Sequence, residues 1–523
     1  MRNPIHGRAT LFVFAAAALA GACICGLAGC HRSSSASRAA TITDKVRTFD
    51  WPRALPEPDA ARLPRWRGFN LQYKFHRDEA NTTITDDPEG IVARDFRMIA
   101  ELGFDFVRIP LDYRIWTNPN DWTDLNEDAL REIDHIVSWG KHYGLHVCLA
   151  FHRAPGWTVH HPRESRDLWT DEEALRVCAL HWSEFARRYA GIPSRQLSFN
   201  LVNEPYTPDP DRHLEVVRHL VEAIRARDPH RLVIADGLDY GQTPEPRLRA
   251  LGVATSTRGY APFNLTHHRA EWMPFAASNL PPRWPDDSVN AFLVGPDKPD
   301  LSAPLRFEGD VAGAVVRMRF ASVSRAARLL VVDDRGRSLL EHRLERSASS
   351  YPPFGYEPLS FVVPPRAESI GILLHDGDWA MLSELSFELE GTIHPVRLRA
   401  ENGATERDPV RFDRTRLDEP FTPTTIRDRR WLEAEFAEWR TLASDGLGTM
   451  VGEFGVYRYT PHDTTLRWMD DQLAVLAEAG LGWALWEFRG WFGILDSGRP
   501  DVAYVPWRGH QLDLRMLELL QRR

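Results

Sequence analysis

The chain has 523 residues, of which 43% are apolar, 26% charged and 11% aromatic. This balance is typical of a folded globular protein, and it excludes disorder, collagen or coiled coil as a description of the whole chain. At about 150 residues per domain, the length fits one large barrel with an extra module. The formal net charge of −9 gives no electrostatic reason to expect a nucleic acid as a partner. Some of the 18 tryptophans offer flat faces on which sugar rings stack, although most are expected to fill the core.

The first thirty residues have the pattern of an export signal. Arg2 and Arg8 precede an apolar run from Leu11 to Leu27, and a positive start before a short apolar segment is typical of a secretory signal. The run ends in Leu-Ala-Gly-Cys at Cys30, which resembles the lipobox of bacterial lipoproteins. The resemblance implies a lipoprotein signal peptide over residues 1–30 and a lipid on the Cys30 thiol. A plain signal peptide with a chance cysteine is the alternative.

This resemblance also implies a place in the cell. The protein is expected at the bacterial cell envelope, anchored in the lipid bilayer through Cys30 and facing the periplasm or the exterior. Residues 31–60 are rich in Ser, Ala, Pro and Arg, which predicts a flexible tether. No later stretch reaches the roughly 18 apolar residues needed to span a bilayer. Cys148 and Cys178 lie in apolar runs and are predicted to be buried thiols rather than a disulfide.

From residue 61 to about 280, short apolar runs alternate with helical periodicity. Val92, Phe96 and Ile99, for example, share one face of a predicted helix. Continuous apolar strands separated by amphipathic helices indicate a parallel sheet that is covered on its outer face. The pattern predicts a (β/α)8 TIM barrel, and the rival doubly wound sheet is weakened because no G-x-G-x-x-G follows the first strand. The expected strands are 69–71, 104–110, 146–151, 197–202 and 232–235.

Between residues 281 and 402 helical periodicity disappears. Alternating apolar runs separated by turn signals predict an inserted all-β sandwich with strands at 314–320, 329–332, 360–363, 370–374 and 385–389. Helix returns over residues 403–523, together with two further strands at 448–451 and 483–486. The predicted α/β architecture is therefore a barrel interrupted between its sixth and seventh strands by a sandwich.

Polar side chains follow the predicted barrel strands, where the active sites of such barrels lie. Glu204 and Glu453 each come directly after a strand, and the sequence has no metalloprotease or serine-hydrolase motif, so no metal or cofactor is predicted. The full set at the strand ends is Arg108, His152, Asn203, Glu204, Asp236, Tyr260, Glu453 and Trp486. The structural alternatives are a cap or ion pair for each charged residue and core packing for the histidine and the tryptophan. For Asp236, a cap on the turn after its own strand is the favoured interpretation.

Five motifs in chain order resemble those of family 5 glycoside hydrolases, the cellulase family. They are Val-Arg-Ile-Pro at 107–110, Phe-His at 151–152, Leu-Ser-Phe-Asn-Leu-Val-Asn-Glu-Pro-Tyr at 197–206, Val-Gly-Glu-Phe-Gly-Val at 451–456, and Trp-Glu-Phe-Arg-Gly-Trp-Phe-Gly-Ile-Leu-Asp-Ser-Gly at 486–498. Each motif lies at a predicted strand end. The resemblance covers about residues 65–275 and 420–523 and leaves the inserted sandwich outside.

The resemblance implies a retaining glycosidase in which Glu204 is the acid/base and Glu453 the nucleophile. Cleavage of a glycosidic bond needs one carboxyl to give a proton while the other supplies negative charge. In the retaining geometry the two groups lie about 5 Å apart. Their repulsion then raises the pKa of one of them and keeps it protonated near neutral pH.

The family pattern also implies roles for the supporting residues. Arg108 is expected to keep the nucleophile ionised, Asn203 to bind the sugar 2-hydroxyl, and Tyr260 to donate a hydrogen bond to the nucleophile. His152 is expected to bind sugar hydroxyls and Trp486 to stack on the sugar at the cleaved bond. Glu487 is expected near the mouth of the barrel, in contact with a sugar.

One residue departs from the family pattern. The family usually has a histidine two residues before the tyrosine that corresponds to Tyr260, whereas this chain has Arg258. Two roles are expected for Arg258: it changes the substrate preference, or it binds a charged sugar. The expected substrate is a β-1,4-linked polysaccharide, a cellulose-like glucan or a mannan, cleaved by endo action. The alternative is a non-catalytic surface lipoprotein that binds carbohydrate through the sandwich. The enzyme is favoured because the chain has both glutamates and the three residues that support them, namely Glu204, Glu453, Arg108, Asn203 and Tyr260.

Overall fold

The computed structural model describes residues 54–77, 83–207, 209–272, 280–346, 356–399, 405, 407–416 and 419–522. The predicted signal peptide, the Cys30 lipidation site and residues 31–53 of the predicted tether lie outside these ranges. Among the described residues, no helix combines the length and the apolar character needed to cross a membrane. Cys148 and Cys178 are both buried and free, as predicted.

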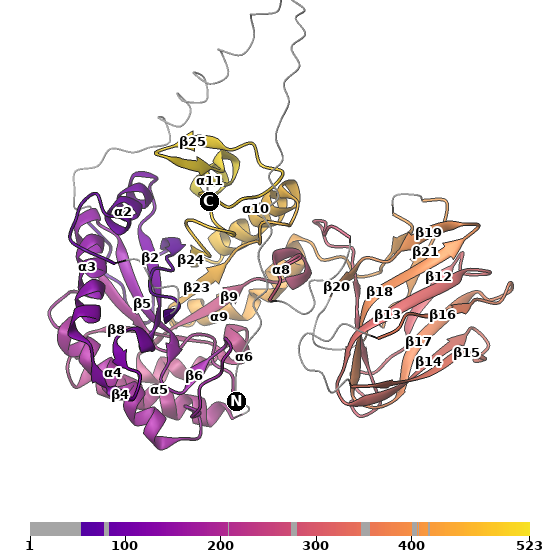
Figure 1. Cartoon of the computed structure of the whole chain (residues 1–523), viewed down its shortest axis with the longest axis horizontal. Helices are drawn as coiled ribbons and strands as arrows, with labels where there is room; N and C mark the ends of the chain where they lie inside the picture. Colours follow the sequence, from indigo (N-terminus) through magenta and orange to yellow (C-terminus); the bar gives the residue numbers. More distant parts are fainter. Residues whose placement is uncertain are drawn as a thin grey trace, which may run out of the picture. The chain divides into compact units, whose positions relative to one another are not determined.

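Eight parallel strands form a closed barrel (Figure 1). In chain order they are β1 (Arg67–Asn70), β2 (Phe106–Asp112), β5 (His146–Ala154), β7 (Leu197–Asn200), β8 (Leu232–Asp236), β9 (Ala254–Gly259), β23 (Thr449–Phe454) and β24 (Gly482–Leu485). Each strand pairs with the next in this order, and β24 pairs with β1, which closes the ring. The predicted barrel is confirmed, and nearly every residue of these strands is buried because helices cover their outer face.

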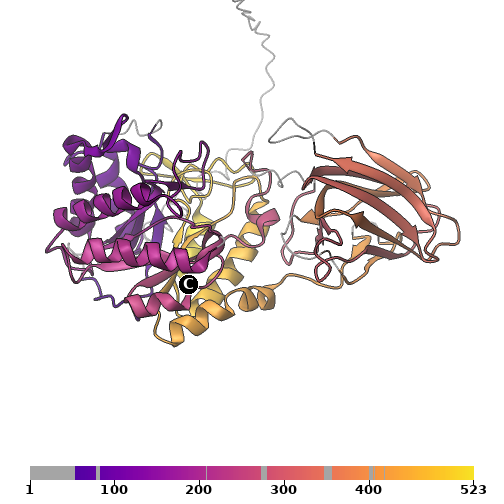
Figure 2. The same cartoon turned by 90° about the horizontal axis from the view of Figure 1, so that it is seen from below.

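Helices surround the barrel strands in both views (Figures 1 and 2). Four of them begin after an Asn or Asp whose side chain accepts backbone N–H groups of the first turn, namely Asn126, Asp171, Asp209 and Asp428. The helices are α2 (Ile91–Glu101), α3 (Glu127–Tyr143), α4 (Glu172–Arg188), α5 (Pro210–Arg225), α6 (Leu238–Gly241), α7 (Phe263–Thr266), α8 (Arg429–Glu435), α9 (Ala437–Ser444), α10 (His462–Glu478) and α11 (Leu514–Arg522), with short 3-10 turns at Tyr113–Ile115 and Pro246–Leu251. Small strands outside the barrel ring are β3 (Thr117–Asn118), β4 (Asp121–Leu125), β6 (Trp157–Thr158), β25 (Val505–Trp507) and β26 (His510–Leu512).

The insert between β9 and β23 is a sandwich of two sheets. One sheet contains β11 (Phe292–Val294), β18 (Trp379–Leu389), β13 (Val315–Val323) and β16 (Leu359–Val362), with β19 (Thr392–Pro395) paired to β18. The other has the order β15 (Ser338–Glu345), β14 (Ala326–Asp333), β17 (Ser369–Asp376), β12 (Leu305–Gly309), β21 (Val410–Phe412) and β22 (Phe421–Thr422). A separate two-stranded parallel sheet is formed by β10 (Val289–Asn290) and β20 (Leu398–Arg399).

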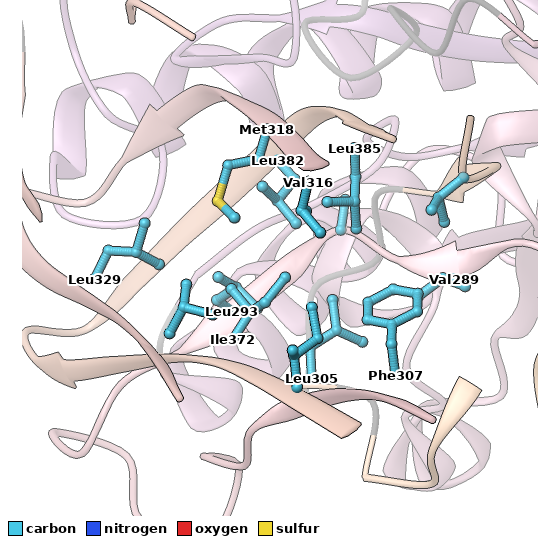
Figure 3. Close-up of a cluster of buried hydrophobic side chains, with 14 of the residues drawn as sticks. Val289, Leu293, Leu305, Phe307, Val316, Met318, Leu329, Ile372, Leu382 and Leu385 are labelled. Atoms are coloured by element: carbon cyan, nitrogen blue, oxygen red, sulfur yellow. The ribbon is translucent and has the colours of Figure 1, made fainter. Parts of the chain in front are cut away.

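Apolar side chains from both sheets meet in one core (Figure 3). Met318 and Leu385 from the first sheet and Phe307, Leu329 and Ile372 from the second are all almost fully buried. These side chains are the apolar positions of the alternating pattern in the sequence, so the predicted sandwich is confirmed, with a hydrophobic core between its two sheets.

The predicted end of the sandwich at residue 402 is too early. Strands β21 and β22 pair with β12 in the second sheet, so the β-structure of the insert continues to Thr422. These strands have three and two residues, which is too short for an alternating pattern to distinguish them from a loop. Asp286 and Arg427 exchange backbone hydrogen bonds of 2.8 and 3.0 Å, so the chain enters and leaves the insert side by side.

Candidate active site

The guanidinium group of Arg108 organises the polar cluster inside the mouth of the barrel. Its Nη1 donates to Glu453 Oε1 at 2.6 Å and to Asn70 Oδ1 at 3.0 Å. Its Nε donates to Asn200 Oδ1 at 3.0 Å, and its Nη2 to Asn203 Oδ1 at 2.8 Å. Arg108 is only 1% exposed. A buried guanidinium group with four hydrogen-bond acceptors fixes the positions of the four side chains that accept from it.

Glu453 is held through both carboxylate oxygens. Oε1 accepts from Arg108, and Oε2 accepts from the Tyr260 hydroxyl at 3.2 Å. The pairing of β23 with both of its neighbours shifts register next to Gly452. An irregularity of this kind turns the strand locally, which directs the following side chain to the site. Glu453 is therefore a buried carboxylate with a matched cation and a hydroxyl donor.

Glu204 lies in the loop after β7, four residues beyond the last residue of the strand, and has a backbone φ of 48°. This left-handed conformation is unfavourable for a glutamate and persists where surrounding contacts impose it. Its backbone N–H donates to Asp236 Oδ2 at 2.9 Å. Its carboxylate accepts from Asn203 Nδ2 at 3.3 Å and from Arg258 Nε at 3.2 Å, while the side chain remains 19% exposed. Glu204 is thus fixed at its backbone, and its side chain is largely buried but still reaches solvent.

The two glutamates converge on the guanidinium of Arg258. Arg258 Nη2 lies 3.4 Å from Glu453 Oε1, and Arg258 Nε is the donor to Glu204. Burial, followed by the charge of Glu453, raises the pKa of Glu204 to about 7, although Arg258 and Arg108 oppose the rise. One carboxyl that keeps a proton near neutral pH beside a second that is paired with two cations can carry out acid and nucleophilic chemistry on one bond.

Aromatic side chains border this cluster. The ring of Trp486 lies 5.8 Å from that of His152 and 5.4 Å from that of Phe75, measured between centroids, and is half-buried. Burial, then the neighbouring His160, lowers the pKa of His152 well below its usual value, so this ring is neutral at physiological pH. Trp486 and His152 therefore lie together, as their positions at the strand ends predicted.

Two acidic residues near the mouth have hydrogen-bond partners within the protein that the sequence did not predict. Asp236 does not cap the turn after its own strand. Its carboxylate instead accepts from Asn200 Nδ2 at 3.0 Å, from the Glu204 backbone and from Arg258. Glu487 accepts the backbone N–H groups of Trp491 and Phe492 in the loop after β24, and burial raises its pKa to about 8. Asp236 thus belongs to the site, and Glu487 supports a loop beside it.

Asn70 and Asn200 were missed by sequence reasoning, although both orient Arg108. The only signal available was an asparagine as the last residue of an apolar strand, at 67–70 and at 197–200. Among the described residues, no three His, Cys, Asp or Glu side chains are grouped so that they could hold a metal ion.

Fold and site together define a (β/α)8-barrel protein in which two glutamates, at the carboxyl ends of the fourth and seventh strands, share the guanidinium group of Arg258. Residues 66–260 match the family model of the cellulases, glycosyl hydrolase family 5. The match covers the first six barrel strands and includes Glu204, Arg108 and Arg258, so the resemblance seen in the sequence motifs is confirmed for this part of the chain. Glu453 lies beyond the matched range.

Curated relatives show the same similarity. Endoglucanase C of Acetivibrio thermocellus is 32% identical over 213 residues, which are 39% of this chain and 59% of that protein. Cellodextrinase A of Ruminococcus flavefaciens is 28% identical over 217 residues, 40% of this chain and 60% of that protein. The chain therefore spans about three fifths of the length of these relatives. A solved structure described as a glycoside hydrolase has a TM-score of 0.58 and 25% identity, and the alignment covers 88% of this chain and 99% of that one.

Proposed function

We propose that the protein is a retaining β-glycoside hydrolase with Glu204 as acid/base and Glu453 as nucleophile. The observation that carries the proposal is the convergence of a carboxyl with a pKa of about 7 and a cation-paired carboxylate on the same guanidinium. The similarity to an endoglucanase and a cellodextrinase supports a β-linked glycan as substrate. We infer endo action on a β-1,4-linked polysaccharide, either a cellulose-like glucan or a mannan.

In the first step a carboxylate oxygen of Glu453 attacks the anomeric carbon of the sugar. The bond from that carbon to the glycosidic oxygen breaks, and the proton of Glu204 passes to the departing oxygen. Charge at the sugar ring develops as in an oxocarbenium ion, and the product is a covalent glycosyl ester of Glu453. In the second step Glu204, now ionised, takes a proton from water, the water oxygen attacks the same carbon, and Glu453 is released with Glu204 again protonated.

The contacts of the neighbouring residues fit this sequence of steps. Arg108 and Tyr260 hold the Glu453 carboxylate, so the nucleophile does not need to reorganise as the reaction proceeds. The Asn203 carbonyl oxygen is occupied by two arginines, which leaves its Nδ2 group directed to Glu204 and available to a sugar hydroxyl. We propose that His152 and Trp486 bind the sugar at the cleaved bond by hydrogen bonding and stacking.

We also propose that the enzyme is anchored at the bacterial cell envelope by a lipid on Cys30, on the strength of the residue pattern at 1–30. Replacing Cys30 with serine is expected to release the protein from the membrane fraction of a bacterial host. Retention of the variant in that fraction would contradict the anchor.

The test of the activity uses the full chain on a panel of soluble β-glucans and mannans, with the products separated by size. Glu453→Ala should abolish hydrolysis, and added azide should restore cleavage of an activated glycoside with inversion at the anomeric carbon. Azide occupies the space left by the missing carboxylate and attacks from the same face. Turnover of the Glu453→Ala variant at the rate of the unmodified enzyme would end the assignment.

A further inference from the structure

Arg258 stands where the family pattern predicts a histidine, and its side chain is the second buried guanidinium of the site. It extends from β9, is 7% exposed, and is the register partner of Glu453 on the neighbouring strand. Burial alone would lower the pKa of Arg258, but Asp236, Glu453 and Glu204 raise it above its usual value, so it is a permanent cation. A histidine here would be neutral over much of the physiological range.

All three nitrogen atoms of this guanidinium have acceptors. Nε donates to Glu204, and Nη2 donates to Asp236 and, at 2.8 Å, to Asn203 Oδ1. Nη1 donates to Ser256 Oγ and to the Thr257 carbonyl oxygen, both at 3.3 Å. Because all three nitrogen atoms already donate to protein acceptors, Arg258 is not free to bind a charged sugar. Binding a charged sugar was one of the two roles expected from the sequence.

The backbone around Arg258 leaves room for this large side chain. At Gly452 a Cβ atom would lie 2.3 Å from Ser256 Oγ and 3.2 Å from Arg258 Nη1. At Gly241, which has a φ of +80°, a Cβ atom would lie 3.1 Å from Arg258 Cγ. Two glycines from different parts of the barrel therefore line the space that the guanidinium occupies. The surroundings fit an arginine at this position.

We propose that Arg258 and Asp236 form an ion pair that positions Glu204 and sets the pH range in which this residue serves as the acid. The inference rests on the proposed function and deepens it. Asp236 fixes the backbone of Glu204 through its N–H, while Arg258 holds the carboxylate of the same residue. One ion pair thereby fixes both ends of the acid/base residue. Arg258 is a positioning residue in this scheme.

The charges that face Glu204 come from several elements and have opposite effects. Arg258 on β9 and Arg108 on β2 favour the ionised carboxylate, whereas Glu453 on β23 and Asp236 on β8 favour the protonated form. The neutral hydroxyls of Tyr260 and Tyr240 also face this group. Removing Arg258 should therefore raise the pKa of Glu204, and removing the charge of Asp236 should lower it. The two changes have opposite signs, which packing damage alone would not produce.

The experiment measures kcat/KM against pH on a soluble β-glucan for the full chain and for the variants Arg258→Gln and Asp236→Asn. The basic limb of this profile reports the pKa of the acid in the free enzyme. We expect Arg258→Gln to move this limb up by about one pH unit and Asp236→Asn to move it down by a similar amount. Arg231→Gln is the matched control, because Arg231 is a buried arginine paired with Asp228 at the opposite ends of the strands. It should reduce stability and leave the limb in place.

The results distinguish a failure of the proposed glycoside hydrolase function from a failure of the proposed role of Arg258. If the unmodified chain cleaves no β-glycan, the proposed function fails. If it is active but the limbs of both variants coincide with its own, the Arg258 proposal alone is refuted. Should Arg258→Gln fail to fold, Asp236→Asn and Arg258→Lys carry the test. The lysine keeps the charge, so the limb should stay within about half a pH unit. The value of kcat should fall at least tenfold, because one ammonium cannot replace the guanidinium at Glu204, Asp236 and Asn203 together. A lysine variant with unchanged kcat would overturn the proposal.

Discussion

Replacing Glu204 with glutamine should stabilise the folded barrel at alkaline pH but much less at acid pH. In the folded protein the pKa of Glu204 is about 7, against an ordinary value of 4.5. The folded state therefore holds this proton more tightly than the unfolded state does. A raised carboxyl pKa makes the free energy of unfolding fall as the pH rises from the unfolded pKa through the folded one. Glutamine is neutral throughout and escapes this loss.

The size of the effect follows from the two pKa values. Their difference, at about 1.36 kcal/mol per pKa unit, corresponds to a gain of about 3 kcal/mol above pH 8. Below pH 4 both forms of residue 204 are neutral, and the gain should fall to within about 0.5 kcal/mol.

The assay is urea unfolding followed by tryptophan fluorescence at pH 4 and pH 8 for the unmodified chain and Glu204→Gln. Glu222→Gln is the control, since Glu222 is an exposed glutamate on helix α5 with a surface ion pair to Arg218. It should change the free energy of unfolding only slightly at either pH. If Glu204→Gln shows the same difference at both pH values, the carboxyl is not a group held protonated by its surroundings, and the assignment of the acid is refuted.

Four further substitutions test separate parts of the structure. Glu204→Ala should lose far more rate on natural glycans than on aryl glycosides with good leaving groups, because only the former need a proton; equal losses would contradict the acid role. Arg108→Lys should lower kcat/KM about 100-fold, because a lysine cannot hold the nucleophile in place. A loss below threefold would refute the role of Arg108 in holding Glu453. Tyr260→Phe should lower kcat/KM about tenfold by removing one hydrogen bond to Glu453, measured on the same substrate, whereas an unchanged value would exclude that bond from catalysis. Phe387→Ala should destabilise the sandwich by about 3–5 kcal/mol in calorimetry, and the absence of any shifted transition would contradict its place in the core.

The sequence predicted the barrel because its strands are long, apolar and separated by helices with one apolar face. It also predicted the main strands of the sandwich, where residues such as those at 315–320 alternate between the core and the outer face. The end of the insert could not be placed, since β21 and β22 are too short to show a period. Their position in the sheet depends on pairing with β12, a strand about a hundred residues away, and local pattern carries no information on such pairing.

At the site, the sequence indicated the two glutamates and their immediate partners because each lies near the carboxyl end of a predicted strand. It did not reveal which groups share partners. Asp236 resembled a turn cap, and its actual contacts with Glu204 and Arg258 arise from neighbouring strands whose register is set by the barrel. Asn70 and Asn200 were missed for the same reason, as their function is to orient the buried Arg108. Strand ends identify candidates, and only the three-dimensional register assigns their partners.

Covalent trapping tests the central claim most directly. The full chain is incubated with an activated 2-deoxy-2-fluoro glycoside of a β-1,4-linked disaccharide, and the labelled peptide is identified by mass spectrometry. Fluorine at that position slows both steps by destabilising the oxocarbenium-like state, and a good leaving group restores the first, so the glycosyl ester accumulates. The mass of one fluorinated disaccharide unit is expected on the peptide that contains Glu453, and Glu453→Gln should abolish the label. A label on any other residue, or a first product with inverted anomeric configuration, would contradict the account.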